Sequence, residues 1–384
     1  MKYRVTILTP TLVGDGRRLS PIDYMVWRDQ VNVLDQSRIF RMLSKSAGPR
    51  LDNYLTQIRK ATKLDFTSWG GYAQNFASRR IPFEDAAYTP YWERAPLESL
   101  AIPEFASGDA GPFLPGAPLK GALRAGFVFA NAKPQALGDA ANRLSGERAP
   151  RRPAEALEQQ AIGAGGSDRM RVFSIGDSEH GSREGFRIYM LRLATLVPKG
   201  PGQFALGWKQ SGRGAADARR PEEGTPAFAE MAAPGAIFEG EWRENDFLNG
   251  DDVRRLLRWS EPVTRAALFN AANAYAAKQL EAHAQYARWT GLELLGQSVA
   301  GLRARLETVR GEGGCLVAMG WASSYLSKSA AIGADDPDYR KLLGSLPYYA
   351  RAIQSGLPFP KTRRIVFLKN KPATVAGWVE LKVS

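Results

Sequence analysis

The stretch that decides the fold is Phe113-Leu114-Pro115-Gly116-Ala117-Pro118-Leu119-Lys120-Gly121-Ala122-Leu123-Arg124-Ala125-Gly126-Phe127. Pro115-Gly116 is a turn dipeptide, and Pro118 suits the first turn of a helix, where its missing N–H costs nothing. From Leu119 onward the apolar residues recur at helical spacing, which predicts a helix over about 119–129. We therefore expect a loop that closes into a helix.

Two cations lie near the start of this helix. Lys120 and Arg124 are four residues apart, so they share one helix face. The free backbone N–H groups and the positive end of the helix dipole lie at the same place, and together they attract an anion, most simply a phosphate. A capped helix with two solvated cations explains the same pattern, so both interpretations stay open at this point.

The charge balance of the chain indicates a polyanionic partner. The 384 residues carry 52 Lys and Arg against 39 Asp and Glu, which gives a formal net charge of +13. Such an excess favours nucleic acid, because binding releases counterions from the phosphates. A membrane surface is the competing partner, but the sequence contains no long basic amphipathic helix and no apolar run of transmembrane length. We expect no contact with a membrane.

Length, cysteine content and the N-terminal residues narrow the class of protein further. The chain is long enough for two domains. The single cysteine, Cys315, excludes an intrachain disulfide framework and a multi-cysteine zinc site, and we expect it to be a small buried residue. Residues 1–7 alternate like a strand and lack the apolar core of a targeting signal. We expect a cytoplasmic protein without a bound metal or cofactor.

The order of the predicted elements favours the α+β class. Strands and helices are interspersed without the regular alternation of a doubly wound sheet, so we expect antiparallel sheets with helices packed on one face, in two domains that meet near residues 180–200. We expect one long helix from about residue 250 to Trp289 and another over 292–309. The chain should close with two strands, 363–368 and 377–381, joined by a turn at 369–372.

Two irregular segments interrupt this pattern. The first holds many aromatic residues interleaved with Arg79, Arg80 and Arg94; these aromatics include Trp69, Tyr72, Phe76, Tyr88, Tyr91 and Trp92. Such residues can stack on RNA bases, but packing of a long excursion onto a core explains them more simply, and we favour it. The second segment, 148–153, is rich in arginine and proline, and we expect it to be exposed.

A second candidate for phosphate contact is the loop Gly14-Asp15-Gly16-Arg17-Arg18. Glycines permit a backbone to approach a ligand closely, and the two arginines can meet its phosphates. A turn with exposed charges explains the loop as well, since a lone Gly-x-Gly is not specific.

Four stretches together resemble the RAMP proteins, the RNA-binding family of CRISPR effector complexes. The loop and helix at 114–124 resemble the family signature, and 8–16 resembles its first strand and glycine loop. Residues 20–24 with 33–35, and the ending 359–364 with Gly377-Trp378-Val379, are similar to one subfamily. That subfamily forms the fifth subunit of type III-A (Csm) complexes.

The resemblance implies two ferredoxin-like (RRM-like) domains, which we expect over 1–185, with an insertion around 65–112, and over 186–384. It also implies a subunit that caps the head of a ribonucleoprotein near the 3′ part of the guide RNA. Such a subunit supports guide maturation and assembly. Its partners are the guide RNA, with or without a paired target, and the other subunits of the type III-A complex.

The resemblance also implies which residues line RNA. Gly14, Gly16, Lys120 and Arg124 fall at motif positions, and Arg17 and Arg18 adjoin the first loop. Residues 320–324 stand where the family carries a glycine-rich loop, but only Gly320 is a glycine, so Lys328 just beyond could substitute. The tail motif contributes Lys361, Arg363 and Arg364, although neighbours in a strand point to opposite faces.

The sequence offers few groups for catalysis. The two histidines are His283, which lies in the predicted long helix as a surface or packed residue, and His180, beside Asp177 and Glu179 in a polar loop. No P-loop, nucleophile elbow or His–His pair with metal-ligand spacing occurs. We therefore predict a non-catalytic RNA-binding subunit. Two alternatives stay open: an endoribonuclease that processes guide precursor with His180 as general base, and a repeating RAMP backbone subunit.

Overall fold

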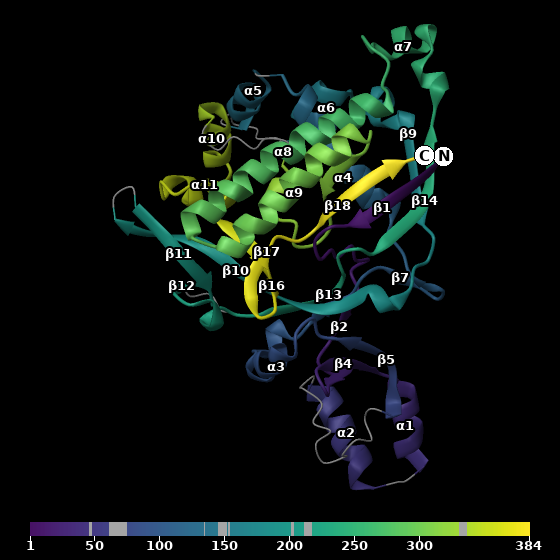
Figure 1. Ribbon diagram of the computed structural model, residues 1–384, viewed down its shortest axis with the longest axis vertical. Coiled ribbons are helices and arrows are strands. Elements are labelled where there is room, and N and C mark those ends of the chain that lie inside the picture. Colours follow the sequence, from purple (N-terminus) through teal and green to yellow (C-terminus); the bar gives the residue numbers. More distant parts are fainter. Residues whose placement is uncertain are drawn as a thin grey trace.

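Two antiparallel sheets and the helices that cover them form the body of the protein (Figure 1). The computed structural model describes residues 1–45, 48–60, 75–133, 135–144, 152, 154–200, 203–210, 217–329 and 336–384. The predicted α+β class is confirmed, and the arrangement is consistent with two ferredoxin-like (RRM-like) domains.

The first sheet contains both ends of the chain. Its order is β15–β18–β1–β14–β9, with strands β1 (Lys2–Ile7), β9 (Phe173–Ser178), β14 (Ile237–Glu244), β15 (Cys315–Ala318) and β18 (Trp378–Val383). Tyr3, Val5 and Ile7 are buried, as the alternation in the sequence predicts. Val5 pairs with Phe238 on one side and with Leu381 on the other, so the N-terminal strand lies at the centre of the sheet.

The second sheet is built around the long strand β10 (Phe186–Gly200). Along one edge β10 pairs with β13 (Ala227–Ala232) and β11 (Gln203–Lys209), and along the other it pairs with β16 (Thr362–Leu368). The short strands β12 (Asp217–Ala218) and β17 (Lys371–Thr374) extend the sheet beyond β11 and β16.

The end of the chain corrects one expectation. The strands near 363–368 and 377–381 do not pair, because β16 pairs with β17 whereas β18 joins the first sheet. The expected boundary between residues 185 and 186 falls between β9 and β10, and the first sheet takes strands from both sides of it. The division into domains 1–185 and 186–384 stays a prediction.

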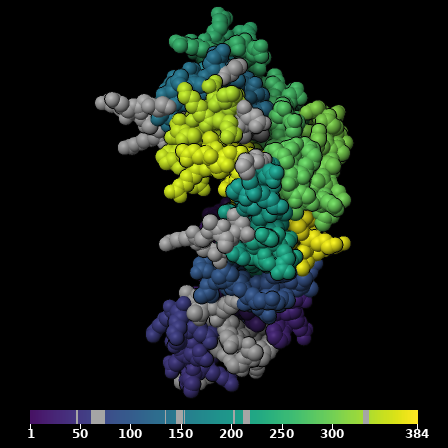
Figure 2. All heavy atoms as spheres, turned by 90° about the vertical axis from the view of Figure 1, so that its left-hand side faces the viewer, coloured from purple at the N-terminus to yellow at the C-terminus, as the bar shows by residue number. Residues whose placement is uncertain are grey.

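The elements between Arg18 and Pro112 lie outside both main sheets. They are β2 (Arg18–Leu19), β3 (Tyr24–Val26), β4 (Gln30–Leu34), α1 (Gln36–Lys45), α2 (Pro49–Lys60), β5 (Ala77–Pro82), α3 (Thr89–Arg94), β6 (Ile102–Pro103), β7 (Ser107–Gly108) and β8 (Gly111–Pro112). In Figures 1 and 2, α1 and α2 form the far end of an elongated molecule. The insertion expected around 65–112 thus belongs to a longer excursion, of which residues 61–74 lie outside the described part.

The aromatic residues of this excursion pack, as we favoured. Tyr88 is buried and its hydroxyl donates to the carbonyl oxygen of Phe367, while the Trp92 indole N–H donates to the Tyr24 hydroxyl. Arg79 forms ion pairs with Glu104 and Glu230. Trp69 and Tyr72 are outside the described residues.

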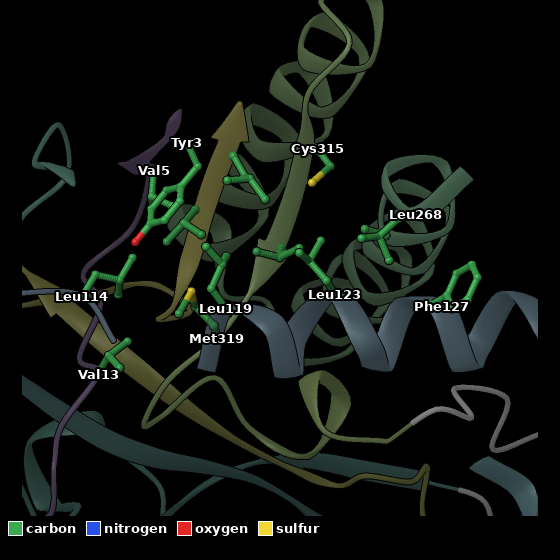
Figure 3. Packing of buried hydrophobic residues seen from close by; sticks show 14 of the residues in the cluster. Tyr3, Val5, Val13, Leu114, Leu119, Leu123, Phe127, Leu268, Cys315 and Met319 are labelled. Atoms are coloured by element: carbon green, nitrogen blue, oxygen red, sulfur yellow. The ribbon is translucent and has the colours of Figure 1, made fainter. Parts of the chain in front are cut away.

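Helix α4 (Gly116–Asn131) is the helix predicted from the opening stretch, and it begins at Gly116 rather than at Leu119. Leu119, Leu123 and Phe127 are buried and point from α4 toward the sheet and α8 (Figure 3). At Gly126 a Cβ atom would lie 2.8 Å from the Cα atom of Ala272, so only glycine lets α8 cross α4 this closely.

The long helix expected to run through Pro262 is divided in two. Helix α7 (Asp251–Leu257) ends at Arg258, whose φ of 58° is left-handed, and α8 (Arg265–Thr290) begins after Thr264. Proline within the segment disfavours a continuous helix. Helix α9 (Glu293–Gly311) follows, and Figure 1 shows α8 and α9 side by side across the strands.

Four further helices pack on one another and reach α4 through α6. They are α5 (Gln135–Leu144), α6 (Glu155–Ile162), α10 (Pro337–Gly344) and α11 (Pro347–Gln354). Residues 148–151 and 153, which we expected to be exposed, lie outside the described part. Cys315 is buried, as predicted. Among the described residues, no helix combines the length and apolarity needed to cross a bilayer.

Candidate nucleic-acid interface

A groove of about 800 Å³ opens between α4, α10 and two loops, and we call it the central groove. The first loop contributes residues between 12 and 18, and the second contributes residues between 318 and 329. Helices α5 and α6 complete its wall. Figure 2 shows the surface hollowed beneath α10 and α11. The central groove brings together six predicted RNA contacts: Gly14, Gly16, Arg17, Arg18, Arg124 and Lys328.

The first loop is held in place by backbone contacts. Thr11 and Ala232 exchange two backbone hydrogen bonds, of 3.1 and 2.8 Å. A Cβ atom at Gly14 would lie 2.7 Å from the Glu104 carbonyl oxygen, and Gly16 has a φ of +97°. Both positions therefore require glycine for the path of the chain itself, which explains them without a ligand.

The second loop packs directly on the first. The backbone N–H of Trp321 donates to the carbonyl oxygen of Leu12 at 2.8 Å. Gly320 has a φ of +84°, and a Cβ atom there would lie 2.2 Å from the same oxygen. The single glycine of this loop thus stands where the second loop approaches the Leu12 backbone.

The cations of the central groove differ in how they are paired. Arg17 is exposed and bonds Asp15 through Nε at 2.7 Å, and this hydrogen bond holds the pKa of the Asp15 carboxyl below its usual value. Arg124 bonds Asp168 at 2.5 Å and Glu158 at 3.2 Å. Arg18 and Lys328 are exposed, and neither side chain bonds another described residue. These two are the cations available to an outside anion.

Lys120 is not part of the central groove. Its half-buried ammonium donates to the carbonyl oxygen of Phe173 at 2.7 Å, and burial lowers its pKa. The start of α4 is also occupied, because the Gly116 N–H donates to Asp177 Oδ1 at 2.8 Å. The anion site expected at this helix start is therefore filled by the chain's own carboxylate.

The tail cations have three different environments. Arg363 is 3% exposed and stacks on the Tyr286 ring, which corrects its assignment as an RNA contact. Burial lowers the pKa of its guanidinium to about 10. Arg364 lies 4.4 Å from the centroid of the Trp321 ring, so it supports the wall of the central groove. Lys361 is half-buried and lies outside the groove lining.

Neither histidine lies in the central groove. His180 is exposed, its Nδ1 lies 2.9 Å from the Gly111 carbonyl oxygen, and its ring packs on Phe113. The neighbouring Glu179 carboxylate pairs instead with Lys2 at 3.2 Å. His283 is 2% exposed within α8, which agrees with a packed helix residue. Among the described residues, His, Cys, Asp and Glu form no cluster suited to a metal ion.

Sequence reasoning missed the apolar part of the central groove. Ala122 and Ala125 belong to the apolar residues at helical spacing in the opening stretch, yet they are half-buried and line the groove together with Gly121. The small size of these side chains could have indicated this face in the sequence, because the core-facing side of a helix normally carries larger apolar residues.

Comparison with known proteins gives the fold. No protein-family model and no curated protein matches the sequence. A chain of a cryo-EM structure of a Csm–crRNA–target RNA ternary complex, from a type III-A CRISPR–Cas system, is similar with a TM-score of 0.65 and 18% identity over 100% of both chains. The crystal structure of Csm5 from T. onnurineus is similar with a TM-score of 0.60 and 16% identity, over 98% of this chain and 99% of that chain. The resemblance read from the sequence is confirmed at the level of the fold.

Proposed function

We propose that the chain is a non-catalytic RNA-binding subunit of a type III-A CRISPR ribonucleoprotein effector. It caps the head of the complex near the 3′ part of the guide RNA, and it supports guide maturation and assembly in the cytoplasm. Its partners are the guide RNA and the other subunits. The observation that carries the proposal is the contact between Leu12 and Trp321, which brings Arg18 and Lys328 to one groove. The similar ternary complex, which contains crRNA and target RNA, supports the same class of partner.

The charges of the central groove suit the phosphates of a guide whose sequence varies. The side chains of Arg18 and Lys328 have no partner among the described residues, so binding a phosphate breaks no ion pair at either of them. The Glu104 carboxylate at the groove pairs with Arg79 at 2.8 Å, and Arg79 also pairs with Glu230. Phosphate contacts fix position without reading sequence, as a subunit for a variable guide requires.

The endoribonuclease alternative requires a general base near the scissile phosphate. His180 is outside the lining of the central groove, and its ring donates no hydrogen bond to the carboxylate of Asp177 or Glu179. The repeating backbone subunit differs in stoichiometry, since it would occur several times in one particle. We propose a subunit present once per complex, and the copy number in the purified particle distinguishes the two.

The test is co-expression with the other genes of the complex and a CRISPR array, followed by purification through this chain. We expect a particle with one copy of the chain and guide RNA of defined length. Arg18→Glu with Lys328→Glu should lower the RNA recovered. Arg303→Glu with Lys371→Glu is the matched control, because it changes charge equally at exposed positions outside the groove.

Three results would contradict the proposal. The first is a chain that purifies alone and cuts precursor RNA, with loss of cleavage in His180→Ala, which would establish the processing enzyme. The second is several copies per particle, which would establish the backbone subunit. The third is an equal loss of RNA in the groove variant and its control.

A further inference from the structure

The floor of the central groove is apolar, and phosphate contacts do not explain it. One face of α4 lines it with Pro118, Gly121, Ala122, Ala125 and Val128, a helical spacing of small and apolar residues. A Cβ atom at Gly121 would meet no heavy atom within 4 Å, so this face is open. An exposed apolar patch that is rimmed by polar residues is typical of a binding site.

The facing wall is also apolar. Leu342, Leu343 and Leu346 line it from the end of α10 and just beyond, and Leu137 and Leu157 line it from α5 and α6. The volume of about 800 Å³ lies in the range of roughly 300–1,000 Å³ that is typical of pockets for small organic molecules. The floor is therefore large enough for a planar organic group.

Aromatic side chains from the second loop stand beside this floor. Trp321 and Tyr325 both line the groove. The guanidinium of Arg364 lies over the Trp321 ring, and this cation–π contact fixes the orientation of the indole. Unstacked bases of single-stranded RNA bind by stacking on such rings.

The hydroxyl groups of the groove are bonded to one another. Tyr325 and Tyr339 share a hydrogen bond of 2.6 Å, Ser329 bonds Tyr339 at 2.9 Å, and Ser323 bonds Ser327 at 2.7 Å. These side chains have few donors and acceptors left to read the edge of a base. A base in this groove would therefore be bound by stacking on its faces, and its identity would contribute little to binding.

We propose that the floor of the central groove receives at least one unstacked nucleobase of the bound RNA, while the adjoining phosphates stay at Arg18 and Lys328. The inference rests on the proposed function, since it assumes that RNA is the ligand of this groove. Charge complementarity selects RNA over an apolar protein segment. The side chains of Arg18 and Lys328 have no partner among the described residues, and an apolar segment in the groove would leave both charges unpaired.

The test is a double-mutant cycle between the floor and the RNA. Gly121→Phe places a ring in the open space of the floor, and Gly301→Phe, also in a helix with open space around its Cβ, is the matched control. The probe is synthetic single-stranded RNA of guide length, in which each nucleotide in turn is made abasic. Binding to the purified full chain is measured for every combination.

We expect abasic substitution at one or a few positions to weaken binding to the wild-type chain roughly 5- to 150-fold, the usual contribution of a stacked base. Gly121→Phe should weaken the intact RNA to a similar degree, and the two changes together should cost no more than either alone. Purine and pyrimidine at the sensitive position should bind within a few-fold of each other. Gly301→Phe should bind like the wild-type chain.

The outcomes separate the inference from the proposed function. Failure of the wild-type chain to bind intact RNA would contradict the proposed function itself. Two results would overturn the nucleobase site alone. In the first, no abasic position weakens binding. In the second, the losses caused by Gly121→Phe and by the abasic site are additive. The site would also be overturned by a Gly121→Phe chain that binds RNA normally but no longer assembles with the other subunits, because the floor would then hold a protein segment. Ala125→Leu fills the same floor and replaces Gly121→Phe if that variant does not fold.

Discussion

The backbone N–H of Trp321 donates a hydrogen bond of 2.8 Å to the carbonyl oxygen of Leu12. This bond joins two loops that are far apart in the chain, and it creates one groove from both. Gly320 makes the contact possible, because any larger residue would place its Cβ atom 2.2 Å from the Leu12 oxygen. The path of the second loop therefore depends on one glycine.

Gly320→Ala should separate the two loops. The φ of +84° is unfavourable for alanine and the Cβ atom would clash, so we expect a loss of roughly 1–3 kcal/mol in the free energy of unfolding, together with weaker RNA binding. Denaturant unfolding and RNA titration measure the two effects. Gly313→Ala is the matched control, because its φ is +73° but its Cβ would meet nothing within 4 Å. Equal losses of stability and RNA binding in both variants would show that the contact does not matter.

Arg18→Ala with Lys328→Ala should reduce the salt dependence of RNA binding. Each phosphate contact with a single strand contributes about 0.7 to the slope of log K against log salt, so the loss of two contacts should lower the slope by about 1.4. The affinity is measured at four or more salt concentrations. The control pair Arg303→Ala with Lys371→Ala should keep the wild-type slope, and an unchanged slope in the groove variant would remove these two residues from the interface.

Lys120→Met should affect stability and leave RNA binding unchanged. The ammonium donates to the Phe173 carbonyl oxygen at 2.7 Å, and the loss of a charged hydrogen bond costs about 1.5–3 kcal/mol. Lys278→Met, at an exposed residue of α8, should change stability by less than about 0.5 kcal/mol. If Lys120→Met kept normal stability but no longer bound RNA, Lys120 would be an RNA contact, as the sequence predicted.

His283 should make the protein less stable in acid. Burial, with a smaller contribution from the charge of Arg363, holds the pKa of His283 well below its usual value of 6.5. Below pH 6.5 the unfolded chain binds a proton that the folded chain does not, so stability falls as the pH falls. This contribution amounts to about 1.4 kcal/mol between pH 7.5 and 5.5. His283→Gln should lack it, and identical pH dependence in both proteins would contradict the burial of a neutral histidine.

Local patterns were sufficient to predict the elements that now position the groove. The spacing of Leu119, Leu123 and Phe127 predicted the buried face of α4, and Tyr3 and Val5 predicted a strand with one buried face. Both signals are periodic within a few residues, so they do not depend on the rest of the fold.

The roles of individual cations could not be predicted in this way. Lys120 bonds Phe173 and Arg124 bonds Asp168, both partners that are distant in the sequence. Arg363 and Arg364 are neighbours in β16 and point to opposite faces, so one is buried and the other supports Trp321. A motif identifies the position of a side chain in the sequence, but its partner is decided by tertiary packing.

The most direct test of the account is ultraviolet cross-linking of the guide RNA within the purified particle, with the cross-linked peptides identified by mass spectrometry. The account predicts that cross-links concentrate in residues 12–18 and 318–329, that they come from a single copy of the chain, and that Arg18→Glu with Lys328→Glu removes most of them. Cross-links confined to other surfaces, or unchanged in that variant, would contradict the central groove as the RNA-binding site.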